Sequence, residues 1–207
     1  MPPELPPTYY LDNVHTLFTH VEQLYSDLLD PDTLDFLQRF DSLGTDARLL
    51  CVRLLNRSGD CFRLSKLDYA EIDSIEAAID ELRQQGFIEY NAPLEAETLL
   101  SLFTLNELRD TIGEFPDLAA GARLRRGELE AYLLEHAGES FMTCLQQRDD
   151  WLLLYHRDEY QLCQMLFFGN LNQSMTDFVL SDLGLNRFED YRIDPDHRPY
   201  RSREEIL

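Results

Sequence analysis

The stretch RLLCVRLLNRSGDCFRLSKLDY, residues 48–69, decides the fold of this chain and contains its most unusual distribution of charge. It holds four arginines and the only lysine, although the chain of 207 residues has a formal net charge of −21. Its first half has apolar residues at helical spacing, Ser58-Gly59-Asp60 predicts a turn, and CFRL at 61–64 alternates as a short strand does. A locally basic helix, turn and strand in an acidic chain indicate a binding site for a negatively charged partner.

The helix in this stretch is predicted over about 45–57. Its buried face is centred on Leu50 and Leu54, and Arg53 and Arg57 lie one turn apart on the opposite face. These arginines either contact a nucleic-acid backbone or only keep an exposed face soluble. The acidic flank supports a local site, because residues 1–44 hold eight acidic residues against a single arginine.

The next segment predicts a second helix and a second strand. In DSIEAAIDELRQQG, Asp73 with Glu76 resembles a capping box, and Gly86 follows where a helix ends. FIEY at 87–90 then reads as a strand. Helix, turn, strand, helix and strand are the outline of a winged helix, and NAP at 91–93 is its expected boundary.

Two short helices joined by a loop are predicted next. Thr104 and Glu107 form a capping box at the first, and LRRGELEAYLLEH at 124–136 forms the second. Arginines at the start of a second short helix are typical of a SAP module, a helix–loop–helix unit that binds duplex DNA. The sequence therefore predicts a SAP-like module over 95–137.

The remaining chain is predicted to be helical from about residue 140. Trp151, Phe167, Phe168 and Phe178 are expected in the core, Gly169 and Gly184 are expected to end helices, and Asp149 and Asp150 are expected only to face solvent. Ser202 with Glu205 predicts the start of a helix, which suggests that the natural chain continues. The predicted fold class is mainly α, with N-terminal helices at 1–44, a winged-helix-like module with a short β-wing at 45–92, the SAP-like module, and a helical segment at 138–207.

Several classes of function are disfavoured by the composition. No apolar run is long enough to cross a membrane, and the N-terminus does not resemble a signal peptide. The cysteines, Cys51, Cys61, Cys144 and Cys163, are interpreted as reduced residues of a cytoplasmic protein. The histidines do not have metal-ligand spacing, and phosphate-loop, hydrolase and zinc-protease motifs are absent from the sequence.

A nuclease motif of the PD-(D/E)xK type cannot be assembled from this sequence. That chemistry needs a lysine two residues after a metal-binding acid. The only lysine is Lys66, and Leu64 precedes it by two positions. The chain is therefore expected to be inactive as a nuclease by itself.

Four ordered blocks nevertheless resemble the Fanconi-associated nuclease family, whose VRR-NUC proteins repair interstrand crosslinks and cut 5′-flap DNA. The blocks are YYLDN at 9–13, LLCVRLLNRSGDCFRLSKLDYAEI at 49–72, LFFGNLNQSMTDFVLSDLG at 166–184 and RFEDYRI at 187–193. The resemblance implies an N-terminal region with winged-helix-like and SAP-like parts. In the family, a helical-repeat domain and a phosphodiesterase-type nuclease domain follow.

The resemblance also implies partners, cofactors and site residues. Branched or flapped duplex DNA is the expected partner, with repair proteins as further candidates and no membrane. Mg or Mn is expected in the nuclease domain, and no cofactor in this chain. The protein would be cytoplasmic, which means nucleoid-associated in a bacterium, or nuclear in a eukaryote. The expected contacts with the DNA backbone are Arg53, Arg57, Arg63 and Lys66 in one group and Arg123, Arg125 and Arg126 in another.

Two other interpretations remain open at this point. An acidic helical scaffold could dock proteins without touching DNA. A winged-helix transcription factor is disfavoured, because its second helix carries Glu76, Asp80 and Glu81 where a groove-reading helix carries arginine or asparagine.

Overall fold

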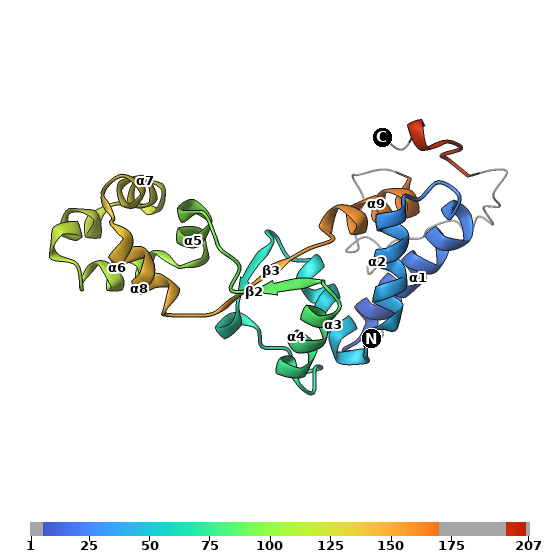
Figure 1. Cartoon of the computed structure of the whole chain (residues 1–207), viewed down its shortest axis with the longest axis horizontal. Coiled ribbons are helices and arrows are strands. Elements are labelled where there is room, and N and C mark those ends of the chain that lie inside the picture. The colour runs from blue at the N-terminus through green and yellow to red at the C-terminus, as the bar shows by residue number, and fades with distance from the viewer. Residues whose placement is uncertain (1–5, 170–197, 206–207) are drawn as a thin grey trace, which may run out of the picture. The chain divides into compact units, whose positions relative to one another are not determined.

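The computed structural model describes residues 6–169 and 198–205, and it is mainly helical with a small antiparallel sheet (Figure 1). This confirms the predicted fold class. The α-helices are α1 (Tyr9–Tyr25), α2 (Pro31–Ser42), α3 (Thr45–Leu55), α4 (Ile75–Gln84), α5 (Ala96–Leu102), α6 (Leu105–Ile112), α7 (Arg126–His136), α8 (Glu139–Gln146) and α9 (Arg157–Phe168). The strands are β1 (Cys61–Arg63), β2 (Ile88–Tyr90) and β3 (Trp151–Leu154), and the short 3-10 helices are η1 (Leu64–Lys66), η2 (Pro116–Arg123) and η3 (Arg203–Glu205).

The chain folds into two compact units. Unit 1 takes the chain up to Ser58, Tyr69–Phe87 and the chain from Tyr155 onward, and so contains α1–α4, α9 and η3. Unit 2 takes Gly59–Asp68 and Ile88–Leu154, which hold the sheet and α5–α8. Among the described residues, no helix is long and apolar enough to span a membrane.

The core of unit 1 is formed by the apolar faces of its helices. The Phe18 ring of α1 lies edge-on to Phe36 and Phe40 of α2, with ring centroids 5.5 and 5.0 Å apart, and to Tyr160 of α9. Helix α3 buries the predicted face, including Leu50 and Leu54. Such aromatic and aliphatic burial supplies most of the stability of a helical unit, because isolated helices of this length are marginal in water.

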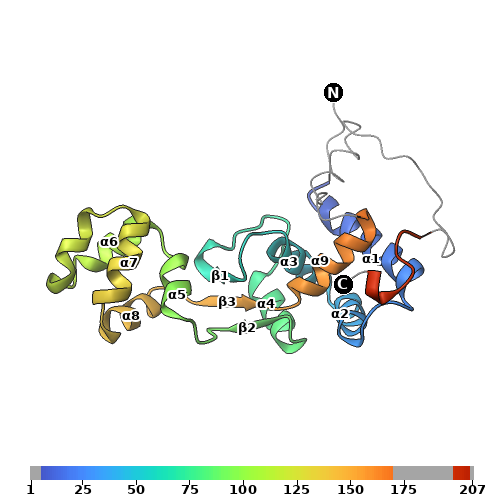
Figure 2. The same cartoon turned by 90° about the horizontal axis from the view of Figure 1, so that it is seen from above.

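Unit 2 is built on a sheet with the strand order β1-β3-β2 (Figure 2). Strand β3 pairs antiparallel with both neighbours, with Phe62 opposite Leu152 on one side and Glu89 opposite Leu153 on the other. The central strand therefore comes from a part of the chain that lies some sixty residues after β2. Helices α5–α8 are inserted between β2 and β3.

The helices of unit 2 share one apolar cluster. The α6 capping box is present as predicted, because the Thr104 side chain accepts from Glu107 N and the Glu107 side chain accepts from Thr104 N. The cluster includes Trp151 of β3, whose Nε1–H donates to Ala92 O at 2.9 Å. Its members are Leu99, Leu100, Phe103, Leu108, Ile112, Leu118, Leu129, Leu133, Phe141, Leu145 and Trp151.

The structure corrects the prediction that the chain is helical throughout from residue 140. Residues 151–154 form the strand β3, which lies between the two predicted wing strands, β1 and β2, and pairs with both of them. The divisions predicted at 44, 92 and 137 are also not those of the compact units. The winged-helix-like stretch contributes α3 and α4 to unit 1 and its strands to unit 2.

The predicted helix ends and buried aromatic residues are confirmed only in part. The N-cap of α4 is Ser74 and not Asp73, since the Ser74 side chain accepts from Ala77 N. Gly86 follows α4 with φ +72°, a conformation in which a Cβ would be strained, and Gly169 ends α9 in the same way. Trp151 is buried as predicted, whereas Phe167 and Phe168 are only half-buried. The predictions for Phe178 and Gly184 lie outside the described residues.

The cysteines are free thiols, as the sequence indicates. Cys51 and Cys163 are buried, and burial raises the pKa of both thiols. They therefore stay neutral and behave as small apolar core residues.

Candidate nucleic-acid interface

Arg53 lies near the end of α3 and is held by an acidic and an aromatic partner. Its Nε donates to Glu71 Oε1 at 2.8 Å, and its guanidinium lies 4.1 Å from the centre of the Tyr10 ring. Tyr10 Oη donates to the same carboxylate oxygen. Burial tends to raise the pKa of Glu71, but the hydrogen bonds from Arg53 and Tyr10 outweigh it, and the pKa is lowered. Arg53 is thus held in an ion pair with Glu71, although its side chain is still 37% exposed.

Arg57 lies one turn further on and remains exposed. Its Nη1 donates to Tyr69 Oη at 3.1 Å, and the Arg53 guanidinium lies 5.4 Å from the centre of the same ring. The structure therefore brings Arg53 and Arg57 together around Tyr69, as their spacing predicts. Of the two, Arg57 has the more accessible charge.

Arg63 is a buried structural residue of unit 2. Its side chain is only 8% exposed, with Nε donating to Asp149 Oδ2 at 2.7 Å and Nη1 to Glu107 Oε2 at 2.9 Å. The guanidinium also lies 4.4 Å from the centre of the Phe103 ring. Two carboxylates already satisfy the charge of Arg63, so a phosphate would have to displace them. These bonds join β1 to the start of α6 and to the residues that precede β3.

Lys66 stands at the edge of this network. Its Nζ is 3.7 Å from Glu107 Oε1, and its side chain is 53% exposed. An exposed pair at this distance contributes little to stability, so the ammonium group is available to an external anion. The hydrogen bond from Arg63 is the main cause that lowers the pKa of Glu107 to about 2.

This lowered pKa predicts an acid-sensitive unit 2. A carboxyl group whose folded-state pKa is depressed stabilises the fold fully above its unfolded value, and this contribution is lost as the pH falls toward the folded value. The free energy of unfolding of unit 2 should therefore fall between about pH 4.5 and pH 2. Urea titrations across this window, followed by Trp151 fluorescence, measure it. Glu107→Gln should flatten the pH dependence and the exposed control Glu135→Gln should not; equal slopes in both variants would contradict this.

The start of α7 carries the second predicted group, and its arginines differ in role. Arg126 holds the helix in place, because Nε donates to Glu130 Oε1 at 2.8 Å and Nη2 to Leu100 O at 3.1 Å, at the end of α5. Arg123 and Arg125 are exposed, and neither forms an ion pair within the residues that the structure describes. Two exposed cations beside the positive end of a helix form a surface that favours phosphate.

Glu128 moderates this surface. Its Oε2 accepts from the backbone N–H of Arg125 at 3.1 Å, so one of the free N–H groups at the start of α7 is already used. The guanidinium groups of Arg123 and Arg125, rather than the helix end itself, are therefore the main attraction for an anion.

The sequence did not indicate the partners of these cations. Asp149 and Asp150 were expected only to face solvent, and this is wrong. Asp149 forms an ion pair with Arg63, and Asp150 accepts hydrogen bonds at 2.6 Å from Tyr90 Oη and from Asn91 Nδ2. Adjacent side chains point to opposite sides of an extended backbone, so neighbouring acids can serve separate networks.

No group of three or more histidine, cysteine, aspartate or glutamate side chains in residues 6–169 and 198–205 is placed to hold a metal ion.

Comparison with known proteins identifies the family. The family model described as FAN1, HTH domain matches residues 8–89. A Fanconi-associated nuclease 1 homolog of Pseudomonas aeruginosa is 33% identical over 208 residues, which cover 99% of this chain and 37% of that protein. A homolog of Oryza sativa is 29% identical, covering 97% of this chain and 22% of that protein.

Solved structures agree with these relatives. A crystal structure of paFAN1 bound to 2nt 5′ flap DNA with gap matches with a TM-score of 0.87 and 32% identity, over 99% of this chain and 38% of that one. A second structure, of paFAN1 bound to 1nt 5′ flap DNA with gap, matches with a TM-score of 0.84 and 30% identity, over 97% of this chain and 37% of that one. The chain thus spans less than two fifths of the length of these relatives. It belongs to the Fanconi-associated nuclease family.

Proposed function

We propose that this chain is a DNA-binding region that orients branched or 5′-flapped duplex DNA for a VRR-NUC nuclease. The observation that supports this most strongly is the match of nearly the whole chain to structures of paFAN1 that hold 5′ flap DNA. The exposed arginines at the start of α7 supply a matching chemistry. The alternative, an acidic module that docks proteins without touching DNA, gains no comparable support from these relatives.

In this proposal the contacts are made by the exposed cations. Arg57 contributes from unit 1, and Lys66, Arg123 and Arg125 contribute from unit 2. Arg53, Arg63 and Arg126 instead hold the framework that presents them, because carboxylates or backbone carbonyls occupy their guanidinium groups. In place of the direct DNA contacts predicted for them, Arg53, Arg63 and Arg126 are therefore assigned a supporting role in the fold.

Contacts with phosphates fit the surface better than contacts with bases. Helix α4, the second helix of the winged-helix-like stretch, exposes Glu76 and Asp80. These carboxylates would be repelled in a DNA groove, where a reading helix normally presents arginine or asparagine. Phosphate contacts fix orientation without reading sequence, as a structure-specific nuclease requires.

Catalysis, with its Mg or Mn, is assigned in this proposal to a VRR-NUC nuclease domain beyond these residues. Attack on a phosphodiester needs metal-bound carboxylates and a lysine in one pocket. Lys66 cannot serve, because Leu64 stands where the acid should be.

A salt-dependent titration tests the proposed function. With about four phosphate contacts, the slope of log K against log salt should be about −3.6, and the dissociation constant should be on the order of micromolar near 0.15 M salt. Fluorescence anisotropy with a labelled flapped duplex measures both values, and an unbranched duplex of the same length serves as control. The absence of binding at 20 mM salt would refute the proposal.

A further inference from the structure

Residues 198–205 lie against the corner between α1 and α2, within unit 1. Arg198 forms a two-pronged ion pair with Asp27, with Nη1–Oδ1 and Nη2–Oδ2 distances of 2.5 and 2.7 Å. The same guanidinium donates to Leu24 O, at the end of α1, and lies 5.6 Å from the centre of the Tyr25 ring. The Arg198 side chain is only 10% exposed.

Tyr200 continues this contact on the side of α9. Its ring centroid lies 6.5 Å from that of Tyr25, and its hydroxyl donates to Gly169 O at 3.3 Å. The contact therefore has an ionic, an aromatic and a backbone component. Arginine suits it better than lysine, because only a planar guanidinium can satisfy both oxygens of Asp27, a carbonyl and a ring face together.

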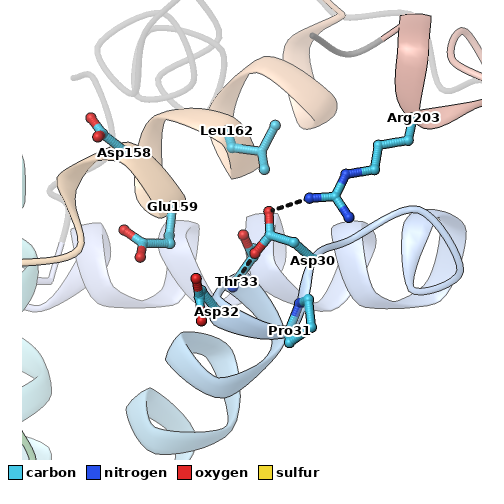
Figure 3. A pocket seen from close by; sticks show the side chains of 8 residues that line it. All are labelled: Asp30, Pro31, Asp32, Thr33, Asp158, Glu159, Leu162 and Arg203. Carbon is cyan, nitrogen blue, oxygen red and sulfur yellow. Dashed lines mark hydrogen bonds and ion pairs between the residues drawn. The ribbon is translucent and has the colours of Figure 1, made fainter.

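Arg203 enters a second, looser site. Figure 3 shows a pocket between the starts of α2 and α9, in which Arg203 reaches toward Asp30. The Nη2–Oδ2 distance is 3.5 Å, and the Arg203 side chain is 53% exposed. The other carboxylates of the pocket are Asp32, Asp158 and Glu159. Four carboxylates line the pocket and only Asp30 pairs with Arg203, so the pocket attracts positive charge without holding it tightly.

We propose that the α1–α2 corner is an arginine-docking surface whose resident ligand is the chain's own segment from Arg198 to Arg203. Asp27, Leu24 O and Tyr25 form the anchoring subsite, and the Asp30 pocket forms the weaker one. An external basic peptide could bind there only by displacing this segment. This inference is independent of DNA binding.

Trypsin cleavage of the 207-residue chain tests the docking. Arg201 is exposed and precedes Ser202, whereas Arg198 precedes Pro199 and resists trypsin, so cleavage after Arg201 reports release of the segment. Asp27→Asn and Arg198→Gln should each raise the rate of cleavage after Arg201 about tenfold, and Arg203→Gln should raise it about twofold. Intact-mass spectrometry over time measures these rates. Asp41→Asn removes an exposed carboxylate of α2 outside the site and should change nothing.

A second measurement identifies the occupant. A labelled synthetic peptide with the sequence of residues 196–205 should bind the Arg198→Gln, Arg203→Gln chain, and bind the parent chain at least fivefold more weakly. Adding Asp27→Asn to the emptied chain should abolish binding. Equal trypsin rates in the parent and Asp27→Asn would overturn the docking, and equal peptide binding by parent and emptied chains would show that the segment is not the resident ligand.

Discussion

Replacing Arg63 by glutamine is expected to lower the free energy of unfolding of unit 2 by about 3 kcal/mol. Arg63 and Asp149 have side chains that are only 8% and 7% exposed, and the substitution leaves the Asp149 carboxylate without its cation. Glu107 keeps its bond from Thr104 N and is 28% exposed, so its loss is smaller. The expected cost is therefore at the lower end of the range for a broken buried pair.

The fluorescence of Trp151 reports the unfolding of unit 2 specifically, so this loss of stability can be measured. It is the only tryptophan, it is 5% exposed, and it belongs to the apolar cluster of that unit. Urea unfolding followed by its fluorescence should show the loss for Arg63→Gln. Arg125→Gln, an exposed control in the same unit, should stay within about 0.5 kcal/mol of the parent.

Coupling between the partners distinguishes a network from a general packing defect. Because Arg63 and Asp149 act together, Arg63→Gln with Asp149→Asn should cost less than the sum of the single changes, by more than about 1 kcal/mol. Additive losses, or a loss below about 1 kcal/mol for Arg63→Gln, would contradict the structural role given to this arginine.

The opposite behaviour is expected of the exposed arginines at the start of α7. Arg123→Gln with Arg125→Gln should leave stability nearly unchanged and weaken binding of flapped DNA. Each neutralised phosphate contributes roughly 1.2 kcal/mol at 0.1 M salt through counterion release, so two lost contacts should weaken binding about sixtyfold. The slope of log K against log salt should become less steep by about 1.8.

The control for the Arg123→Gln, Arg125→Gln variant removes two positive charges at other positions of the chain. Arg83→Gln with Arg148→Gln deletes two arginines that are paired with Asp80 and Glu114. This control should change the affinity less than about threefold, because those arginines release few counterions on binding. A similar loss in both double variants would mean that net charge, and not a contact at α7, controls affinity.

Local signals in the sequence predicted the features that depend on neighbouring residues. The capping box of Thr104 and Glu107, the buried face of α3 and the positive φ of Gly86 all follow from spacing within one or two turns. The four ordered blocks were sufficient to identify the family. These features need no knowledge of distant contacts.

The features that the sequence did not predict depend on long-range pairing. Strand β3 reads WLLL, an apolar run that a helix could bury equally well, and only its pairing on both sides makes it a strand. The turn after it places His156 at φ +66°, which is uncommon for residues other than glycine. Arg63 looked like a surface cation because its partner Asp149 lies 86 positions away.

Hydrogen–deuterium exchange with and without DNA tests the central claim most directly, because it locates the contact without altering the chain. With saturating flapped duplex, peptides covering residues 121–130 should exchange at least threefold more slowly, and peptides covering α4, residues 75–84, should be unchanged. Protection of 75–84 without protection of 121–130 would contradict the account, because the helix with exposed carboxylates, and not the arginines at the start of α7, would then face the DNA.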